Sequence, residues 1–104
     1  MICKAYRSQV SPGGLDKFTK MIKEQRTPLI SKRKGFKGTY LLTKPNGEFL
    51  ELTFWEKEEQ AMAWWNCPEH KQLEGQAKQL AAFGPFTTVI QDVFEVQDIG
   101  SLGA

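Results

Sequence analysis

The sequence predicts an α+β fold in a single domain, and three observations lead to this prediction. Hydrophobic residues alternate with a period of two in four segments and recur every three to four residues in two others. These segments follow one another as strand, helix, strand, strand, helix and strand, without internal repeats. The chain has 104 residues, of which 40% are hydrophobic and 25% charged, as is typical of one globular domain with a modest core.

The first half of the chain predicts a strand, an amphipathic helix and a second strand. Residues 2–9 alternate as a strand, and residues 11–14 form a turn that opens the helix. Thr27-Pro28 interrupts the helix, Leu29-Ile30 is expected to add a final packed turn, and residues 35–43 form the next strand. The apolar stripe of the helix consists of Leu15, Phe18, Met21, Ile22 and Gln25.

A hairpin, a broken helix and a last strand follow. Asn46-Gly47 suits the positive φ angles of a tight turn and leads into a strand over residues 48–55. Residues 56–66 fit a short helix. Pro68 then opens another helix, because its missing N–H costs nothing at the first helical position. Gly84-Pro85 ends that helix, and residues 86–96 form the last strand.

This element order is that of a ferredoxin-like β-α-β-β-α-β sandwich, an antiparallel sheet with helices on one face. Residues 1–97 form the domain and residues 98–104 a flexible tail. The uncovered sheet face is expected to be apolar, so two copies should pack there as a C2 homodimer, a dimeric α+β barrel. Its apolar residues are expected to be Cys3, Ala5, Leu41, Phe49, Trp55, Val89 and Val93.

Charge and composition argue against several functional classes. A net charge of +2 does not favour nucleic acid, and the basic residues 32–34 with Lys37 are best interpreted as a solvated loop, with a phosphate patch as the alternative. No apolar run reaches the roughly 20 residues of a membrane span. Two cysteines, Cys3 and Cys67, make no disulfide framework, which favours a cytoplasmic location.

Residues 55–70 hold the three tryptophans, the single histidine and one of the cysteines. His70 shares a helical stripe with apolar residues, so it is predicted to point inward as a general base or a hydrogen-bonding group. The alternative is a structural histidine bonded to the backbone, and a metal site is not expected at a lone histidine. Trp65 is the better pocket candidate, while Trp64 is expected at the helix edge or a dimer contact, and Trp55 at the subunit interface.

Three further positions complete the predicted site. Tyr6, Tyr40 and Phe54 are expected on the sheet surface that faces the helices, where they would line a pocket together with Trp65 and His70. Arg7 is predicted on the other face, paired with Glu51. Cys67 beside Pro68 is interpreted as an N-cap substitute, with a reactive thiol next to His70 as the alternative.

Particular residues resemble the antibiotic biosynthesis monooxygenase domain family over roughly residues 2–97. They are Arg7, the Gly35-Phe36-Lys37-Gly38 strand start, Trp55 before an acidic helix start, and the Asn66-Cys67-Pro68-Glu69-His70 turn. The resemblance implies a dimeric α+β barrel with a pocket between sheet and helices, in which some members oxidise aromatic substrates with O2 and without metal or flavin.

The resemblance therefore implies a cofactor-independent monooxygenase acting on an aromatic or quinone-like molecule, with His70, Trp65 and Tyr40 as candidate catalytic residues. The alternatives are a non-catalytic ligand-binding or stress-related dimer and a haem-binding relative. The haem-degrading branch pairs a first-strand Asn with a helix Trp and a His about ten residues later. Trp65 matches that Trp, but residues 2–9 contain no Asn and the tenth position after Trp65 is Gly75.

Overall fold

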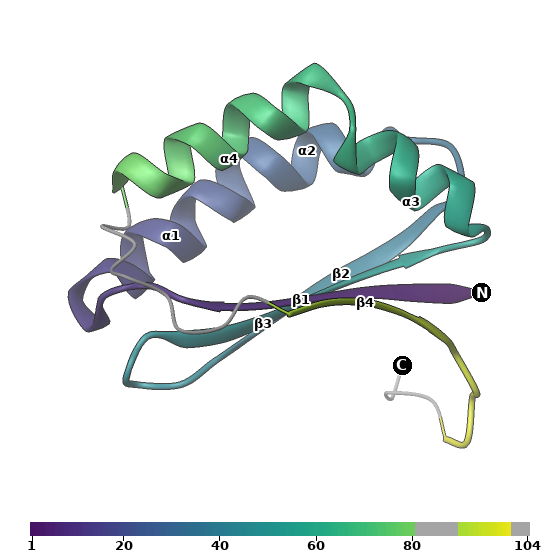
Figure 1. The fold of residues 1–104 in the computed structure, drawn as a ribbon, viewed down its shortest axis with the longest axis horizontal. Coiled ribbons are helices and arrows are strands. Elements are labelled where there is room, and N and C mark those ends of the chain that lie inside the picture. Colours follow the sequence, from purple (N-terminus) through teal and green to yellow (C-terminus); the bar gives the residue numbers. More distant parts are fainter. Residues whose placement is uncertain (81–89, 101–104) are drawn as a thin grey trace.

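A four-stranded antiparallel sheet is covered by helices on one face (Figure 1). The structure is a computed structural model, and it describes residues 1–80 and 90–100. The strand order is β2-β3-β1-β4, which confirms the predicted ferredoxin-like sandwich. The strands are β1 (Ile2–Gln9), β2 (Phe36–Thr43), β3 (Glu48–Trp55) and β4 (Ile90–Glu95). The helices are η1 (Pro12–Gly14), α1 (Leu15–Met21), η2 (Ile22–Arg26), α2 (Thr27–Ile30), α3 (Glu58–Trp65) and α4 (Pro68–Leu80).

The first long helix contains a π-helical turn, η2, that the sequence did not reveal. The N–H of Thr27 donates to the carbonyl of Ile22, five residues earlier, so the turn holds one residue more than an α-helical turn. The helix then continues through Pro28 instead of breaking there. The extra residue rotates the inward stripe, so Arg26 and Ile30 are buried while Gln25 and Leu29 are exposed. The prediction of Gln25 on the stripe was therefore wrong.

The β2–β3 hairpin has the predicted Asn46-Gly47 turn. Gly47 adopts φ of 95°, a conformation that residues with a side chain rarely take. A Cβ at this position would lie 1.9 Å from the carbonyl oxygen of Val10, which shows how tightly the turn packs on the end of β1. The Val10 N–H also donates to the Gly47 carbonyl at 2.9 Å. The hairpin tip is thus fixed to the first strand.

The face of β3 that is covered by the helices is not the predicted one. Its alternate residues Phe49, Glu51, Thr53 and Trp55 are all buried, and the residues between them are only partly buried. Glu51 lies opposite Tyr6 of β1 and Leu41 of β2, so these side chains share the helix-covered face. The other face, here called the open face, carries Cys3, Ala5, Arg7, Tyr40, Leu42, Leu50, Leu52, Phe54 and Phe94.

Four residues predicted on the uncovered face therefore lie on the covered one. The Phe49 ring packs 4.7 Å from that of Phe18 on α1, and Trp55 is fully buried against Phe36, with ring centroids 5.4 Å apart. Val93 pairs with Lys4 and Leu41 with Glu51, on the same side. Cys3 and Ala5 lie on the open face as predicted, and Val89 falls outside the residues that the structure describes.

A β-bulge changes the alternation of faces at the start of β2. Phe36 pairs with Trp55, and Gly38 pairs with the preceding residue, Phe54, so Lys37 is an extra residue in the strand. The bulge turns Phe36 to the helices, whereas Gly38 and Tyr40 lie on the open face.

The junction of α3 and α4 follows the predicted pattern. The Lys57 N–H donates to Gln60 Oε1 at 3.0 Å at the start of α3, and Pro68 is the first residue of α4. Cys67, which precedes Pro68, is buried. Trp64 is 1% exposed inside the core, so its predicted place at a helix edge or dimer contact was wrong. This junction brings the end of α3 and the first turn of α4 over the sheet.

Candidate functional site

Three aromatic residues from three elements meet beneath the α3–α4 junction. Tyr6 of β1 and Trp65 of α3 have ring centroids 5.5 Å apart, and the His70 ring on α4 lies 4.3 Å from that of Trp65. Trp64 also lies against the imidazole, with ring centroids 5.4 Å apart. The inward orientation predicted for His70 and its grouping with Trp65 and Tyr6 therefore agree with the structure.

His70 carries an imidazole that is buried without hydrogen bonds. It is 6% exposed, and neither Nδ1 nor Nε2 has a hydrogen-bond partner among the described residues. The nearest carboxylate oxygen, Glu74 Oε2, lies 3.5 Å from Nε2. Burial, together with the charges of Arg26 and Lys4, lowers the pKa of His70 to about 4, against the opposing effect of Glu74. The ring is therefore neutral at pH 7 and can both accept and donate a hydrogen bond.

Lys4 adds a buried cation to this cluster, a feature that the sequence prediction missed. The Lys4 ammonium lies 4.5 Å from the centroid of the Trp65 ring and 3.9 Å from Met62 Sδ. No carboxylate in the described part of the chain forms an ion pair with it. Burial lowers its pKa. The signal was available in the sequence, because Lys4 lies two residues before Tyr6 in an alternating strand.

A buried ion pair lies next to the aromatic cluster. Arg26 Nη2 donates to Glu51 Oε1 at 2.8 Å, and Arg26 Nη1 has no partner in the part of the chain that the structure describes. Burial raises the pKa of the Glu51 carboxyl, while the Arg26 charge acts in the opposite direction. Arg26 comes from the π-helical turn and Glu51 from the covered face of β3. Neither was predicted as a site residue.

A cavity of about 350 Å³ opens beside this ion pair, between the first helical segment and the edge of β2. Tyr40 reaches the cavity, although its ring lies on the open face and contacts Phe54 edge-on at 6.2 Å. The placement of Tyr40 and Phe54 on the same sheet face as Tyr6 was wrong, because the side of β3 turned to the helices was misassigned. The lining residues are Thr19, Ile22, Lys23, Arg26, Thr27, Thr39, Tyr40, Leu41, Thr43 and Glu51.

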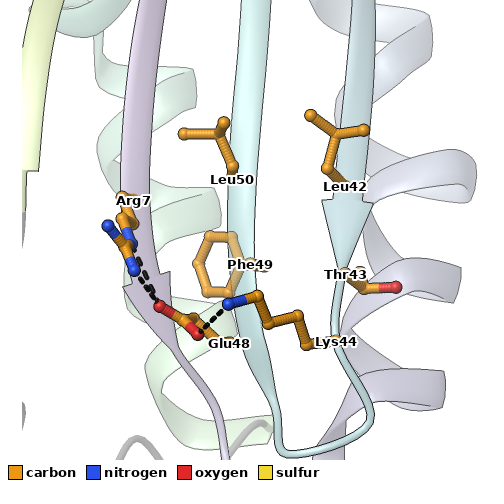
Figure 2. Close-up of a pocket in the computed structure, with 7 residues that line it drawn as sticks. All are labelled: Arg7, Leu42, Thr43, Lys44, Glu48, Phe49 and Leu50. Atoms are coloured by element: carbon orange, nitrogen blue, oxygen red, sulfur yellow. Dashed lines mark hydrogen bonds and ion pairs between the residues drawn. The ribbon is translucent and has the colours of Figure 1, made fainter.

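A second cavity, of about 320 Å³, lies near the hairpin end of the sheet (Figure 2). Figure 2 shows Arg7 and Lys44 both reaching Glu48, and the Lys44 Nζ–Glu48 Oε2 distance is 3.0 Å. Hydrogen bonds from Arg7 and Lys44 hold the pKa of Glu48 below its usual value. The predicted partner of Arg7, Glu51, lies on the opposite face, so that pairing was wrong. These three charges join the end of β1 to the β2–β3 hairpin.

Two kinds of site do not occur in the described residues. No group of three or more His, Cys, Asp or Glu side chains there is placed to hold a metal ion. No helix among residues 1–80 and 90–100 has the length and hydropathy that a membrane crossing requires.

The sheet, its helical layer and the buried aromatic cluster together define a small ferredoxin-like protein with polar groups buried beside that cluster. The profile of the antibiotic biosynthesis monooxygenase family matches residues 1–76, so the chain belongs to this family. A sequence search found no match among curated proteins.

Solved structures show the same fold at low sequence identity. The monooxygenase from the ActVA-Orf6 gene of Streptomyces coelicolor, in complex with nanaomycin D, superposes with a TM-score of 0.75 at 15% identity, covering 96% of this chain and 92% of that one. SnoaB, a cofactor-independent oxygenase from Streptomyces nogalater, gives 0.69 at 12% identity, with 99% and 97% covered. A conserved protein from Methanosarcina mazei gives 0.71 at 12% identity, with 92% of each chain covered.

Proposed function

We propose that the chain is a cofactor-independent monooxygenase that oxidises an electron-rich aromatic molecule, a phenol or hydroquinone-like compound, with O2. One observation carries the proposal. His70 is buried against Trp65 and close to the Lys4 ammonium, with no partner at Nδ1 among the described residues and only the Glu74 carboxylate, at 3.5 Å, near Nε2. A buried polar group without a partner costs about 1–3 kcal/mol, and a bound ligand would satisfy it. The named relatives that are oxygenases support the reaction class.

The residues have distinct roles in this proposal. The neutral His70 accepts the proton of the phenolic hydroxyl, and the Lys4 and Arg26 charges favour the phenolate that forms. Tyr6 and Trp65 hold the aromatic ring by stacking. Burial of Lys4, Arg26 and His70 strengthens these charge interactions, because water screens them little. The same two cations disfavour an imidazolium in the empty site, so the proton on His70 is readily returned.

The chemistry balances without a resident cofactor. The phenolate transfers one electron to O2, and the resulting radicals combine at a ring carbon to form a peroxide, which takes up the proton held by His70. Loss of water then breaks the O–O bond and leaves a carbonyl. One oxygen atom stays in the quinone and the other leaves as water. Its two hydrogens come from the substrate O–H and C–H bonds.

The test uses 1-naphthol as a probe substrate and follows formation of the naphthoquinone with an oxygen electrode. The wild type should consume one O2 per quinone, and isotopically labelled O2 should place one labelled atom in the product. His70→Gln should lower kcat/KM by about 100-fold, the lower range of general-base contributions. Glu74→Gln, which keeps the imidazole, should retain most of the activity. An electron-rich phenol panel with no turnover would exclude the proposal.

The two alternative functions give different outcomes in the same assays. A ligand-binding protein without catalysis would bind the naphthol and consume no O2. A haem-binding relative would shift the Soret band on titration with haem, and His70→Ala would abolish that shift.

We also propose that two copies associate through the open face. Three large apolar residues of this face, Tyr40, Leu42 and Phe94, are each about half exposed, at 50%, 51% and 54%. Leu50, Leu52 and Phe54 lie between them in the register and are partly buried. A contiguous apolar sheet face of this kind favours a self-complementary contact between copies.

A further inference from the structure

The cavity beside η2 carries more positive charge than its own residues neutralise. Arg26 and Lys23 are cationic, and Glu51 is the one carboxylate among its lining residues. Arg26 uses one of its terminal nitrogens on Glu51 and leaves Nη1 buried without a partner. An arginine held on one side has its remaining N–H groups available for a planar anion.

The π-helical turn creates this arrangement. It brings Arg26 to the inner side of the helix, while Lys23, from the same turn, is exposed and lines the cavity. Both cations therefore reach one cavity from a single turn of backbone. The side chain of Arg26 is about 5% exposed, so its charge acts where water screens little. π-Helical turns are frequent at functional sites, and here the turn has an identifiable consequence.

The other lining residues of the cavity favour a ligand with an aromatic ring. Ile22, Tyr40 and Leu41 provide apolar surface, and Thr19, Thr27 and Thr43 provide hydroxyl groups. A volume of about 350 Å³ lies at the small end of the range for ligand sites. A ring system of one or two rings with one carboxylate matches both the volume and the charge.

We infer that this cavity binds a small aromatic carboxylate, with Arg26 and Lys23 holding the carboxylate and Ile22, Tyr40 and Leu41 packing on the ring. The cavity does not reach the His70 cluster, since neither His70 nor Trp65 lines it, although the Arg26 charge acts on both. It would remain a binding site even if the chain had no oxygenase activity.

The test compares two probes of the same shape, 2-naphthoate and its neutral amide 2-naphthamide, by titration followed with amide NMR. The carboxylate should bind about tenfold more tightly than the amide, the effect of one charge-assisted hydrogen bond. The largest shifts should fall in residues 19–27 and 39–43. Equal affinities, or shifts confined to Trp65 and His70, would overturn the inference.

Matched variants distinguish a loss of cavity charge from a loss of folding as the cause of weaker binding. Lys23→Ala should weaken naphthoate binding several-fold, whereas Lys20→Ala, an exposed lysine on α1 outside the cavity wall, should leave it unchanged. The double variant Arg26→Gln/Glu51→Gln keeps the net charge of the cavity but removes the guanidinium. It should lose the preference for naphthoate over the amide, with its fold verified by the dispersion of the same spectra. Retention of the preference in the double variant would overturn the role of Arg26.

Discussion

Arg26 Nη2 lies 2.8 Å from Glu51 Oε1, with both side chains more than nine-tenths buried. This pair connects the π-helical turn to the centre of the sheet. Each charge compensates the other in a region where neither could be hydrated, so the loss of one partner leaves an uncompensated buried charge.

We therefore predict that Glu51→Ala destabilises the fold by about 3–5 kcal/mol, the usual cost of breaking a buried pair. Urea unfolding at neutral pH measures the change. The matched control is Glu56→Ala, which removes an ion pair with Lys37 in which both side chains are about half exposed, and should change stability little. Similar effects of the two substitutions would show that the Arg26–Glu51 pair is not the structural contact inferred here.

The sequence predicted the strands but not which face of β3 is covered. Glu51 is one reason, because it is a charged residue on the covered face. The bounds of β1 and β3 and the α4 start at Pro68 follow directly from alternation and turn residues. β3, however, has apolar residues on both faces, and the covered face also carries Glu51 and Thr53. Polar residues normally mark the solvent side of a strand, so the pattern favoured the wrong face. The conflict occurs where the candidate site lies, as is expected of functional positions.

Only part of the candidate site was predicted, because the sequence shows the direction of some side chains and not of others. Trp65 and His70 lie on helices whose 3–4 periodicity fixes their direction, and the meeting of His70 with Trp65 follows from the short break at Pro68. Arg26 depends on a π-helical turn, which inserts a residue without any composition signal. Tyr40 was misplaced because the covered face of the sheet had been misassigned.

The pKa of His70 predicts a pH-dependent stability. In the folded chain it is lowered from 6.5 to about 4, so the unfolded chain binds more protons between these values. Stability is then complete above pH 6.5 and falls as the pH drops through this window, by on the order of 3 kcal/mol. Urea unfolding as a function of pH measures it. His70→Gln should remove this part of the slope, and an unchanged slope in the variant would contradict burial of a neutral imidazole.

Lys4 should act on the ionisation of the bound phenol. Replacing its ammonium by the apolar Lys4→Met should lower kcat/KM for 1-naphthol at neutral pH by about tenfold or more, the worth of one hydrogen bond to a charged group. The loss of kcat/KM should be smaller at alkaline pH, because the phenol there ionises without the Lys4 charge. The measurement is a pH–rate profile, with the exposed Lys71→Met of α4 as the control. An equal loss at every pH would assign Lys4 a packing role against Trp65 only.

The open face gives the last prediction, a change of oligomeric state. Leu42 is 51% exposed on the edge strand β2, within the open face that also carries Tyr40 and Phe94. A carboxylate placed there must lose its hydration when two copies meet, so Leu42→Glu should shift the protein from dimer to monomer. Leu29 on α2 is also exposed, at 38%, but it lies on the helical layer, so Leu29→Glu should leave the dimer intact. Size-exclusion chromatography with light scattering distinguishes these states, and a monomeric wild type would refute association through this face.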